Sequence, residues 1–393
     1  MLPILPQPLG AVLVDPAISP SAVSRSQKCR LQVHGRQLDK QRFPTLLDHP
    51  AQTVGTLVHR AIELADGCSN IFDVFDQLVE LVHKSNALDP RLAHINDLKG
   101  SVSADLWASR VTLLRSRSGV RHFDGQVTLR GIAQVAPSSS DGSRAFAPGT
   151  HYEYWLRSVV HGISGVVDHL EMLADGSIRI VDWKTGRVTD DSGRIFDSYR
   201  LQMTAYRMVA EELWPGRQVS TWLYDGVMNE IKGEAADTAQ VLEACHAVTQ
   251  LKSPQMAFEL ASVGGHCFSC QLRLVCPAYR RLGPDGIWNS VDAERPPHSI
   301  DLAGSVESVV RAAGDVVVKL NSSRNKTTSQ IRFSGFRFEP DAWLGKEIQV
   351  FNAVAILPRN AHPGKFGYPR VGRDERRGRD LGTNVQFEVF EVG

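Results

Sequence analysis

The 393-residue sequence predicts an α/β fold for its larger first part and a small, mostly β unit for its last quarter. Three observations lead to this prediction. Apolar residues recur with helical spacing over residues 52–66 and again over 199–213. Between these segments, two short β-branched stretches flank a turn signal, Leu173-Ala-Asp-Gly-Ser177. From about residue 300 onward, short strand-like runs alternate with turns.

The elements of the first part follow in order along the chain. In residues 52–66 the apolar stripe consists of Val54, Leu57, Val58, Ala61, Ile62 and Ala65. Further helices are expected at 71–85, 101–116, 199–213 and 237–251, and a strand at 220–224. A loop rich in serine, glycine and proline occupies residues 138–149. Residues 188–198 are expected to form a mobile loop beside the candidate site.

The length of the loop inside the β hairpin decides where its acidic residues point. A two-residue loop would pair Asp168 with Trp183 and turn the two aspartates to opposite faces. A three-residue loop, in which Gly176 closes a bulge, pairs Asp168 with Asp182 instead. Lys184 then lies on the same face, because side chains alternate along a strand. Facing carboxylates repel each other, and a divalent cation between them would turn this repulsion into a binding site.

A solvated hairpin with a few surface charges is the alternative interpretation of these residues. The flanking positions oppose it, since they are mostly apolar and β-branched: Val166, Val167, Ile178, Ile180 and Val181. The hairpin is therefore expected to be largely buried, where charges without partners are too costly to keep. The two aspartates and the lysine thus indicate a functional site.

Three of the six cysteines form a compact motif, in which Cys267 and Cys270 are followed by Cys276 and Pro277. Neither a secretory segment nor a bilayer-spanning stretch is evident, so a cytoplasmic setting is expected. Clustered cysteines in that setting bind metal more often than they form disulfides. A zinc ion or an iron–sulfur cluster with four thiolate ligands needs one more cysteine. Cys68 and Cys245 are expected to be small apolar residues on helices.

Together these motifs resemble the PD-(D/E)XK nucleases. Asp168, followed after a short hairpin by Asp182-Trp-Lys184, is similar to the core motif of that superfamily, with valine in place of the proline that can precede the first aspartate. The helix around His59 and the pair Gln202 and Tyr206 resemble its RecB-like branch. The resemblance spans roughly residues 18–280 and implies a restriction-endonuclease-like mixed sheet flanked by helices.

The resemblance also implies a metal site. His59, Asp168 and Asp182, with the backbone carbonyl of Trp183, would hold Mg²⁺ or Mn²⁺. Glu153, ahead of the hairpin, is a further acidic candidate.

Three more residues acquire roles from the same resemblance. Lys184 would orient or help deprotonate the attacking water and stabilise the transition state, and Gln202 would hold the scissile phosphate. Tyr206 would approach the phosphate or the lysine, unless it only packs the helix against the sheet.

The iron–sulfur nucleases of this branch join the C-terminal cysteine triplet to a cysteine near the N-terminus. In this sequence a serine-rich stretch, residues 19–28, precedes Cys29. The resemblance therefore implies a structural [4Fe-4S] cluster held by Cys29, Cys267, Cys270 and Cys276. Spacing alone leaves zinc as the alternative.

The expected domain division has an N-terminal extension (1–17), the nuclease domain (18–285), a linker (286–299) and a β-rich unit (300–393). The motifs of the last unit identify no family, and an oligonucleotide-binding barrel is one option for its fold. Aromatic residues alternating with arginines would suit base stacking, although such alternation more often marks a core: Phe333, Phe336 and Phe338, with Arg332 and Arg337. Residues 370–379 are expected to be a flexible surface segment.

The predicted function is metal-dependent hydrolysis of DNA phosphodiester bonds, by an exonuclease or end-processing enzyme in DNA repair or in defence against foreign DNA. The expected partners are single-stranded DNA or duplex ends and a helicase or other protein subunit, but no membrane. A net charge of +1 excludes a global basic field, so DNA binding would depend on local patches and on the metal. Two alternatives stay open: an inactive DNA-binding scaffold subunit of a helicase–nuclease complex, and an iron–sulfur redox sensor.

Overall fold

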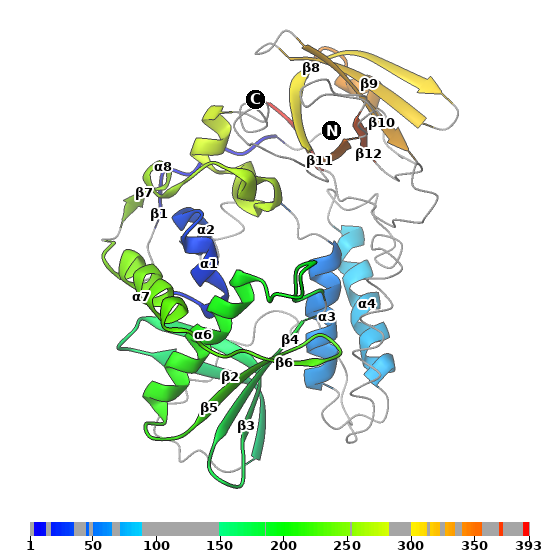
Figure 1. Cartoon of the computed structure of the whole chain (residues 1–393). Coiled ribbons are helices and arrows are strands. Elements are labelled where there is room, and N and C mark those ends of the chain that lie inside the picture. Colours follow the sequence, from blue (N-terminus) through cyan, green and yellow to red (C-terminus); the bar gives the residue numbers. More distant parts are fainter. Residues whose placement is uncertain are drawn as a thin grey trace.

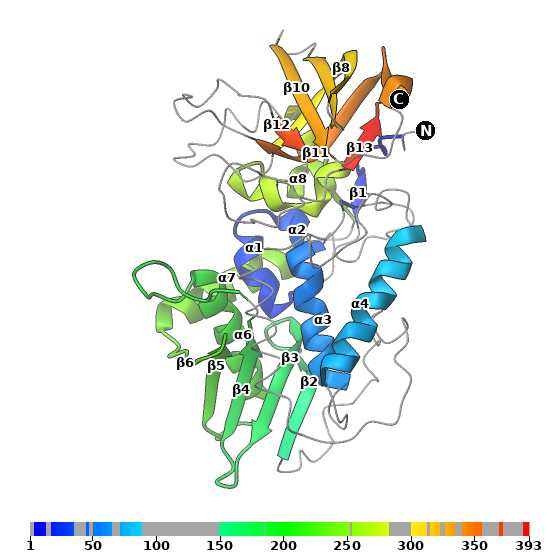
Figure 2. The same cartoon turned by 90° about the vertical axis from the view of Figure 1, so that its right-hand side faces the viewer.

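The computed structural model describes residues 4–12, 17–34, 45–46, 50–64, 71–88, 149–184, 186–251, 254–282, 300–312, 315–322, 327–334, 340–355, 369–371 and 388–392. Several predictions lie outside the described parts: the helix at 101–116, the linker at 286–299, Cys68, the side chains of the Phe333 to Phe338 segment, and most of residues 370–379. Figures 1 and 2 show the C-terminal strands at the top, the cysteine-bearing segment below them and a second sheet at the bottom.

The lower sheet is five-stranded and mixed. Its spatial order is β2 (Gly149–Ser158), β3 (Ile163–Met172), β4 (Ile178–Trp183), β5 (Val219–Tyr224) and β6 (Met228–Glu230). Neighbouring strands are antiparallel except β4 and β5, which are parallel. Helix α6 (Asp197–Leu213) supplies the crossover that a parallel pair requires. Strand β2 was not predicted, although its alternating aromatic residues are a strand signal.

Helices cover both faces of this sheet (Figure 1). Val181 and Trp183 of β4 face α3 (Pro50–Leu64) and α4 (Ile71–Leu88). Ile178 and Ile180 face the other way, toward a layer formed by α6, α7 (Ala235–Thr249), α1 (Val23–Ser26) and the short helix η1 (Pro20–Ala22). This arrangement confirms the predicted α/β class. Within the described parts of the chain, none of the helices is long and apolar enough to cross a membrane.

The cysteine-bearing segment forms a second, smaller core. It contains β7 (Gln255–Met256), α8 (Ala257–Leu260), the short helices η4 (Gly265–Ser269) and η5 (Gln271–Leu274), and a helix over 277–282. The N-terminal strand β1 (Ala11–Val12) pairs with β7, and α2 (Arg30–His34) lies close by. Phe351 and Phe390 of the C-terminal strands join the same core, which ties the two regions together.

The C-terminal strands are β8 (Ile300–Ala312), β9 (Asp315–Ser322), β10 (Thr327–Ser334), β11 (Glu347–Ala355), β12 (Pro369–Val371) and β13 (Glu388–Glu391), with the short helix η6 (Pro340–Trp343) before β11. Strand β12 pairs in parallel with β10 and antiparallel with β11. Because β11 also pairs with β8, the strands β8-β9-β10-β12-β11 close into a ring. The β-rich character of the last quarter is therefore confirmed.

Candidate active site

The hairpin between β3 and β4 has the three-residue loop that the sequence predicts. The amide of Leu173 donates to the carbonyl of Ser177 (2.9 Å), and Gly176 adopts a φ of +80°. Leu170 pairs with Ile180 and His169 with Val181, so the next position along the same register sets Asp168 opposite Asp182. The predicted register is confirmed.

Asp168 is fixed by two neighbours at the point where the β3–β4 ladder ends. Its Oδ2 accepts a hydrogen bond from the backbone amide of Trp183 (2.7 Å). Its Oδ1 lies 3.3 Å from Nδ1 of His59, which projects from α3. The helix that carries His59 and the hairpin that carries Asp168 therefore meet, as predicted. Trp183 meets Asp168 through its amide, whereas a role as metal ligand was predicted for its carbonyl.

Glu153 lies on β2 opposite Asp168, since its two neighbours pair with His169 and Val167. Among the described residues other than glycine, Glu153 alone has a positive φ, +48°. That conformation is costly for a residue with a Cβ and is typical of functional sites. Ligand atoms of His59, Glu153 and Asp168 all lie within 4.8 Å of one another, close enough to bind one metal ion. The structure thus makes Glu153 a stronger candidate metal ligand than the sequence alone did.

Asp182, Lys184 and Gln202 form a connected group beside these ligands. The ammonium of Lys184 lies 2.5 Å from Oδ2 of Asp182. The side-chain amide of Gln202 donates to Oδ1 of Asp182 (2.9 Å), and its oxygen accepts from Lys184 (3.2 Å). Asp182 is only 3% exposed and Gln202 only 7%. Because both the nitrogen and the oxygen of its side-chain amide are engaged, Gln202 positions Asp182 and Lys184. This role fits the geometry better than the contact with phosphate that the resemblance implied.

Tyr206 is buried one turn further along α6. Its hydroxyl donates to the carbonyl of Val166, and its ring lies against Gly165. Burial raises the pKa of Tyr206 well above its ordinary value, and the charges of Asp182 and Asp168 add to this. Tyr206 therefore stays protonated and packs α6 against β3, in agreement with the structural alternative.

Burial and the neighbouring charges shift the pKa values of the site. Burial raises the pKa of Asp182 to about 6 despite Lys184, and the charge of Asp168 contributes. Burial lowers the pKa of His59, but the carboxylates of Asp168, Asp182 and Glu153 outweigh it and raise the value to about 9. For Lys184, burial is likewise outweighed by Asp182 and Asp168, so its pKa rises. Crowded, buried carboxylates of this kind are stabilised by a cation.

The four predicted cluster cysteines come together in the second core. Cys29, Cys267 and Cys276 belong to it, and Cys270 packs against it. The amide of Ser262 lies 3.5 Å from Sγ of Cys29. All five cysteines that the structure describes are free thiols.

His266 was not singled out in the sequence, although it directly precedes Cys267. Hydrogen bonds with the thiols of Cys267 and Cys29 raise its pKa to about 10. Burial raises the pKa of the Cys29 thiol, but the hydrogen bonds from His266 and Ser262 outweigh it, so the net shift is downward. Burial raises the pKa of Cys270 to about 12 and that of Cys276 to about 11.

Cys245 lies apart from this group on α7, in the core under the lower sheet. It is 3% exposed, and burial raises the pKa of its thiol to about 11. This environment agrees with the predicted apolar role.

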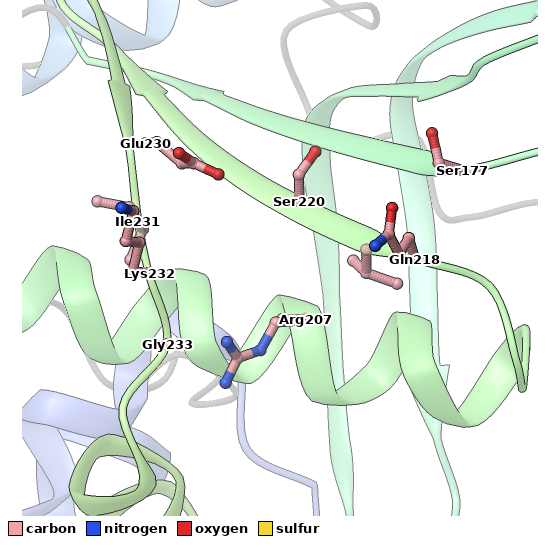
Figure 3. Close-up of a pocket in the computed structure, with 9 residues that line it drawn as sticks. Ser177, Arg207, Gln218, Ser220, Glu230, Ile231, Lys232 and Gly233 are labelled. Atoms are coloured by element: carbon pink, nitrogen blue, oxygen red, sulfur yellow. The ribbon is translucent and has the colours of Figure 1, made fainter. Parts of the chain in front are cut away.

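A separate cavity of about 310 Å³ lies between α6, the start of β5 and the segment 230–233 at the end of β6 (Figure 3). Arg207 reaches from α6 toward Gly233, where an added Cβ would lie 1.7 Å from the guanidinium. Polar groups of Gln218, Ser220 and Glu230 also line it. The cavity shares no residue with the metal-binding group and is distinct from the candidate active site.

Comparison with known proteins identifies the family of this chain. A model of the PD-(D/E)XK nuclease superfamily matches residues 17–277. Because this match covers well over half of the chain, the protein belongs to the PD-(D/E)XK nuclease superfamily. Membership supports a nuclease, that is, a hydrolase of phosphodiester bonds. No curated protein matches the chain.

Two solved structures show a weak likeness to the chain. SSO0001 is 18% identical over 33% of this chain and 61% of its own length, with a TM-score of 0.21. A protein from Eubacterium rectale named "Putative exonuclease" is 13% identical over 72% of this chain and 91% of its own, with a TM-score of 0.29. At these TM-scores neither likeness bears on the function.

Proposed function

We propose that this protein is a nuclease of the RecB-like branch that hydrolyses DNA phosphodiester bonds with Mg²⁺ or Mn²⁺. The observation that supports this best is the convergence of His59, Glu153 and Asp168 within 4.8 Å, beside the pair formed by Asp182 and Lys184. We further propose that it acts on DNA ends, in repair or in defence against foreign DNA.

The donor atoms suit such an ion. Carboxylate oxygens and an imidazole nitrogen are accepted ligands of Mn²⁺, and carboxylates are the preferred protein ligands of Mg²⁺. His59, Glu153 and Asp168, which already converge, would hold the ion, and Asp182 and the carbonyl of Trp183 are the further ligands expected from the family. When bound, the ion would acidify a water and neutralise charge on the phosphate.

Lys184 and Gln202 have complementary roles in this proposal. Asp182 and Asp168 raise the pKa of Lys184 above its ordinary value in the absence of a metal ion. Lys184 would orient the water or help deprotonate it, and would stabilise negative charge on the phosphate. Gln202, which bonds both Lys184 and Asp182, would keep that side chain in place.

We also propose that Cys29, Cys267, Cys270 and Cys276 hold a structural [4Fe-4S] cluster. This proposal is supported by the four thiols sharing one small core, to which the N-terminal segment contributes Cys29 and residues 267–276 contribute the other three. Zinc bound by the same four thiolates is the alternative.

The proposed partners are single-stranded DNA or duplex ends, and a helicase or another protein subunit. An oligonucleotide-binding barrel consists of five strands. The ring that β8, β9, β10, β12 and β11 form in the C-terminal unit supports such a barrel.

Cleavage assays test the nuclease proposal. Labelled single-stranded DNA, duplex DNA and RNA are incubated with Mn²⁺, with and without chelator, using wild type, Lys184→Met and the control Lys84→Met from α4, where Lys84 is exposed and pairs with Glu80. We expect DNA cleavage by wild type and the control, and a loss of at least about a hundredfold for Lys184→Met. Undiminished cleavage by Lys184→Met would overturn the assignment. DNA binding without any cleavage by wild type would favour the scaffold alternative.

Iron and zinc analysis tests the cluster. Protein purified without oxygen should contain iron and sulfide and absorb visible light, and Cys270→Ser should lose both, whereas Cys245→Ser should keep them. Zinc in place of iron would contradict the cluster.

A further inference from the structure

An aromatic pair extends outward from the ammonium of Lys184. Its Nζ lies 4.8 Å from the centre of the Tyr199 ring, close enough for a cation–π contact. The rings of Tyr199 and Phe196 are 6.2 Å apart and nearly perpendicular, at 65°. Tyr199 is partly covered by the core, whereas Phe196 is 39% exposed. A partly exposed aromatic ring thus lies two contacts away from the proposed catalytic amine.

The backbone that carries Phe196 is well supported, in contrast to the mobile loop expected over residues 188–198. The amide of Phe196 donates to the carbonyl of Val188 (3.0 Å), whose side chain is buried. Thr189 and Ile195 form a β-bridge, and the carboxylate of Asp190 accepts from the amides of Ser192 and Arg194. Phe196 then caps α6, so its ring is displayed by a turn joined directly to a helix.

Charges on this turn are balanced rather than basic. Arg187 pairs with Asp191 (2.7 Å), and Arg194 pairs with Asp190 (3.2 Å). The turn therefore offers no surplus positive charge to a phosphate backbone. What it offers beside the site is the apolar face of Phe196.

We propose that Phe196 stacks on an unpaired base of the nucleic acid, close to the scissile phosphate. This inference rests on the proposed nuclease function and deepens it. The 4.8 Å and 6.2 Å contacts place the Phe196 ring at most about 11 Å from Nζ of Lys184, which corresponds to about three nucleotides of a stacked strand and to fewer of an unstacked one. A base inside a duplex already stacks on both faces and is not available to the ring. The site therefore selects single-stranded or frayed DNA without reading its sequence.

The test removes the two stacking partners separately, the aromatic ring from the protein and the base from the DNA. Phe196→Leu and Phe196→Trp are compared with wild type and with Phe258→Leu, a control at a phenylalanine of similar exposure, 45%. Each acts with Mn²⁺ on a single-stranded oligonucleotide and on the same strand with abasic residues around the cleavage site. Phe196→Leu should raise KM on the normal strand about tenfold with little change in kcat. Phe196→Trp and Phe258→Leu should stay within about twofold of wild type, and all four proteins should agree on the abasic strand.

An unchanged KM for Phe196→Leu, or an equal loss on the abasic strand, would overturn the stacking site. Binding is measured separately by fluorescence anisotropy with Ca²⁺ in place of Mn²⁺. If wild type cleaves nothing, the nuclease proposal fails, and a base-dependent loss of binding in Phe196→Leu still supports stacking. If that loss is also absent, the stacking proposal fails too. Circular dichroism checks that each variant is folded.

Discussion

Removing the carboxylate of Asp301 should strongly destabilise the junction between the cysteine-bearing segment and the C-terminal strands. Arg273 of η5 donates from Nη1 to both carboxylate oxygens of Asp301 on β8, each at 2.8 Å. The side chains are 3% and 1% exposed. Tyr279 also donates to Asp301, and Nε of Arg273 donates to the carbonyl of Cys270 (2.9 Å). The pair therefore connects β8 directly to a predicted cluster ligand.

Asp301→Ala leaves the Arg273 guanidinium buried without its main counter-charge. Breaking a buried ion pair from one side costs about 3–5 kcal/mol, because the remaining charge stays desolvated. With a urea dependence of roughly 2–3 kcal/mol per molar, the unfolding midpoint should fall by about 1–2.5 M. Replacing both partners with apolar residues, as in Arg273→Met with Asp301→Leu, should restore much of that loss.

The matched control is Asp341→Ala. Asp341 also pairs with an arginine, Arg311, at 2.7 Å, but the two side chains are 56% and 64% exposed. An exposed pair contributes at most about 1 kcal/mol. Urea unfolding followed by circular dichroism compares these three variants, Asp301→Ala, the double variant and Asp341→Ala, with wild type. An Asp301→Ala loss no larger than that of Asp341→Ala would refute the reasoning, and a double variant no better than the single one would place the loss in packing rather than charge.

Three further predictions concern other parts of the chain. Gly165→Ala should cost about 1–3 kcal/mol in thermal unfolding, because its Cβ would lie 2.6 Å from Pro20, whereas Gly10→Ala, with open space around it, should cost little. Cys245, with a pKa of about 11, should resist alkylation at pH 8, where roughly one thiol in a thousand is ionised; rapid labelling in peptide mapping would contradict its burial. Affinity for Mn²⁺ should rise between pH 7 and pH 9, since His59, with a pKa of about 9, must lose its proton to bind metal; a pH-independent affinity in calorimetry would exclude His59 as a ligand.

The local parts of the site could be predicted from the sequence because short-range rules determine them. Gly176 suits a two-residue as well as a three-residue loop, but the apolar flanks of the hairpin favour a buried site, and only the three-residue register places Asp168 opposite Asp182. Alternation along β4 then puts Lys184 on the face of α6, where it meets Gln202.

Other features depend on contacts between distant segments, which no local pattern specifies. The left-handed backbone of Glu153 becomes visible only when β2 lies against β3. The closure of the C-terminal ring requires β12 to pair with both β10 and β11, on the basis of three residues, 369–371. The buried pair of Arg273 and Asp301 joins two segments that the sequence analysis assigned to different domains.

Binding of Mn²⁺ to the wild type and to Asp168→Asn, measured by electron paramagnetic resonance, tests the central claim most directly. Glu171→Gln is the control, since Glu171 lies on the same strand but pairs with Arg179 away from the metal ligands. We predict one tight site in the wild type and in Glu171→Gln, and its loss in Asp168→Asn without a change in fold. Equal binding by Asp168→Asn, or no tight site in the wild type, would contradict the proposal that these carboxylates hold a divalent ion.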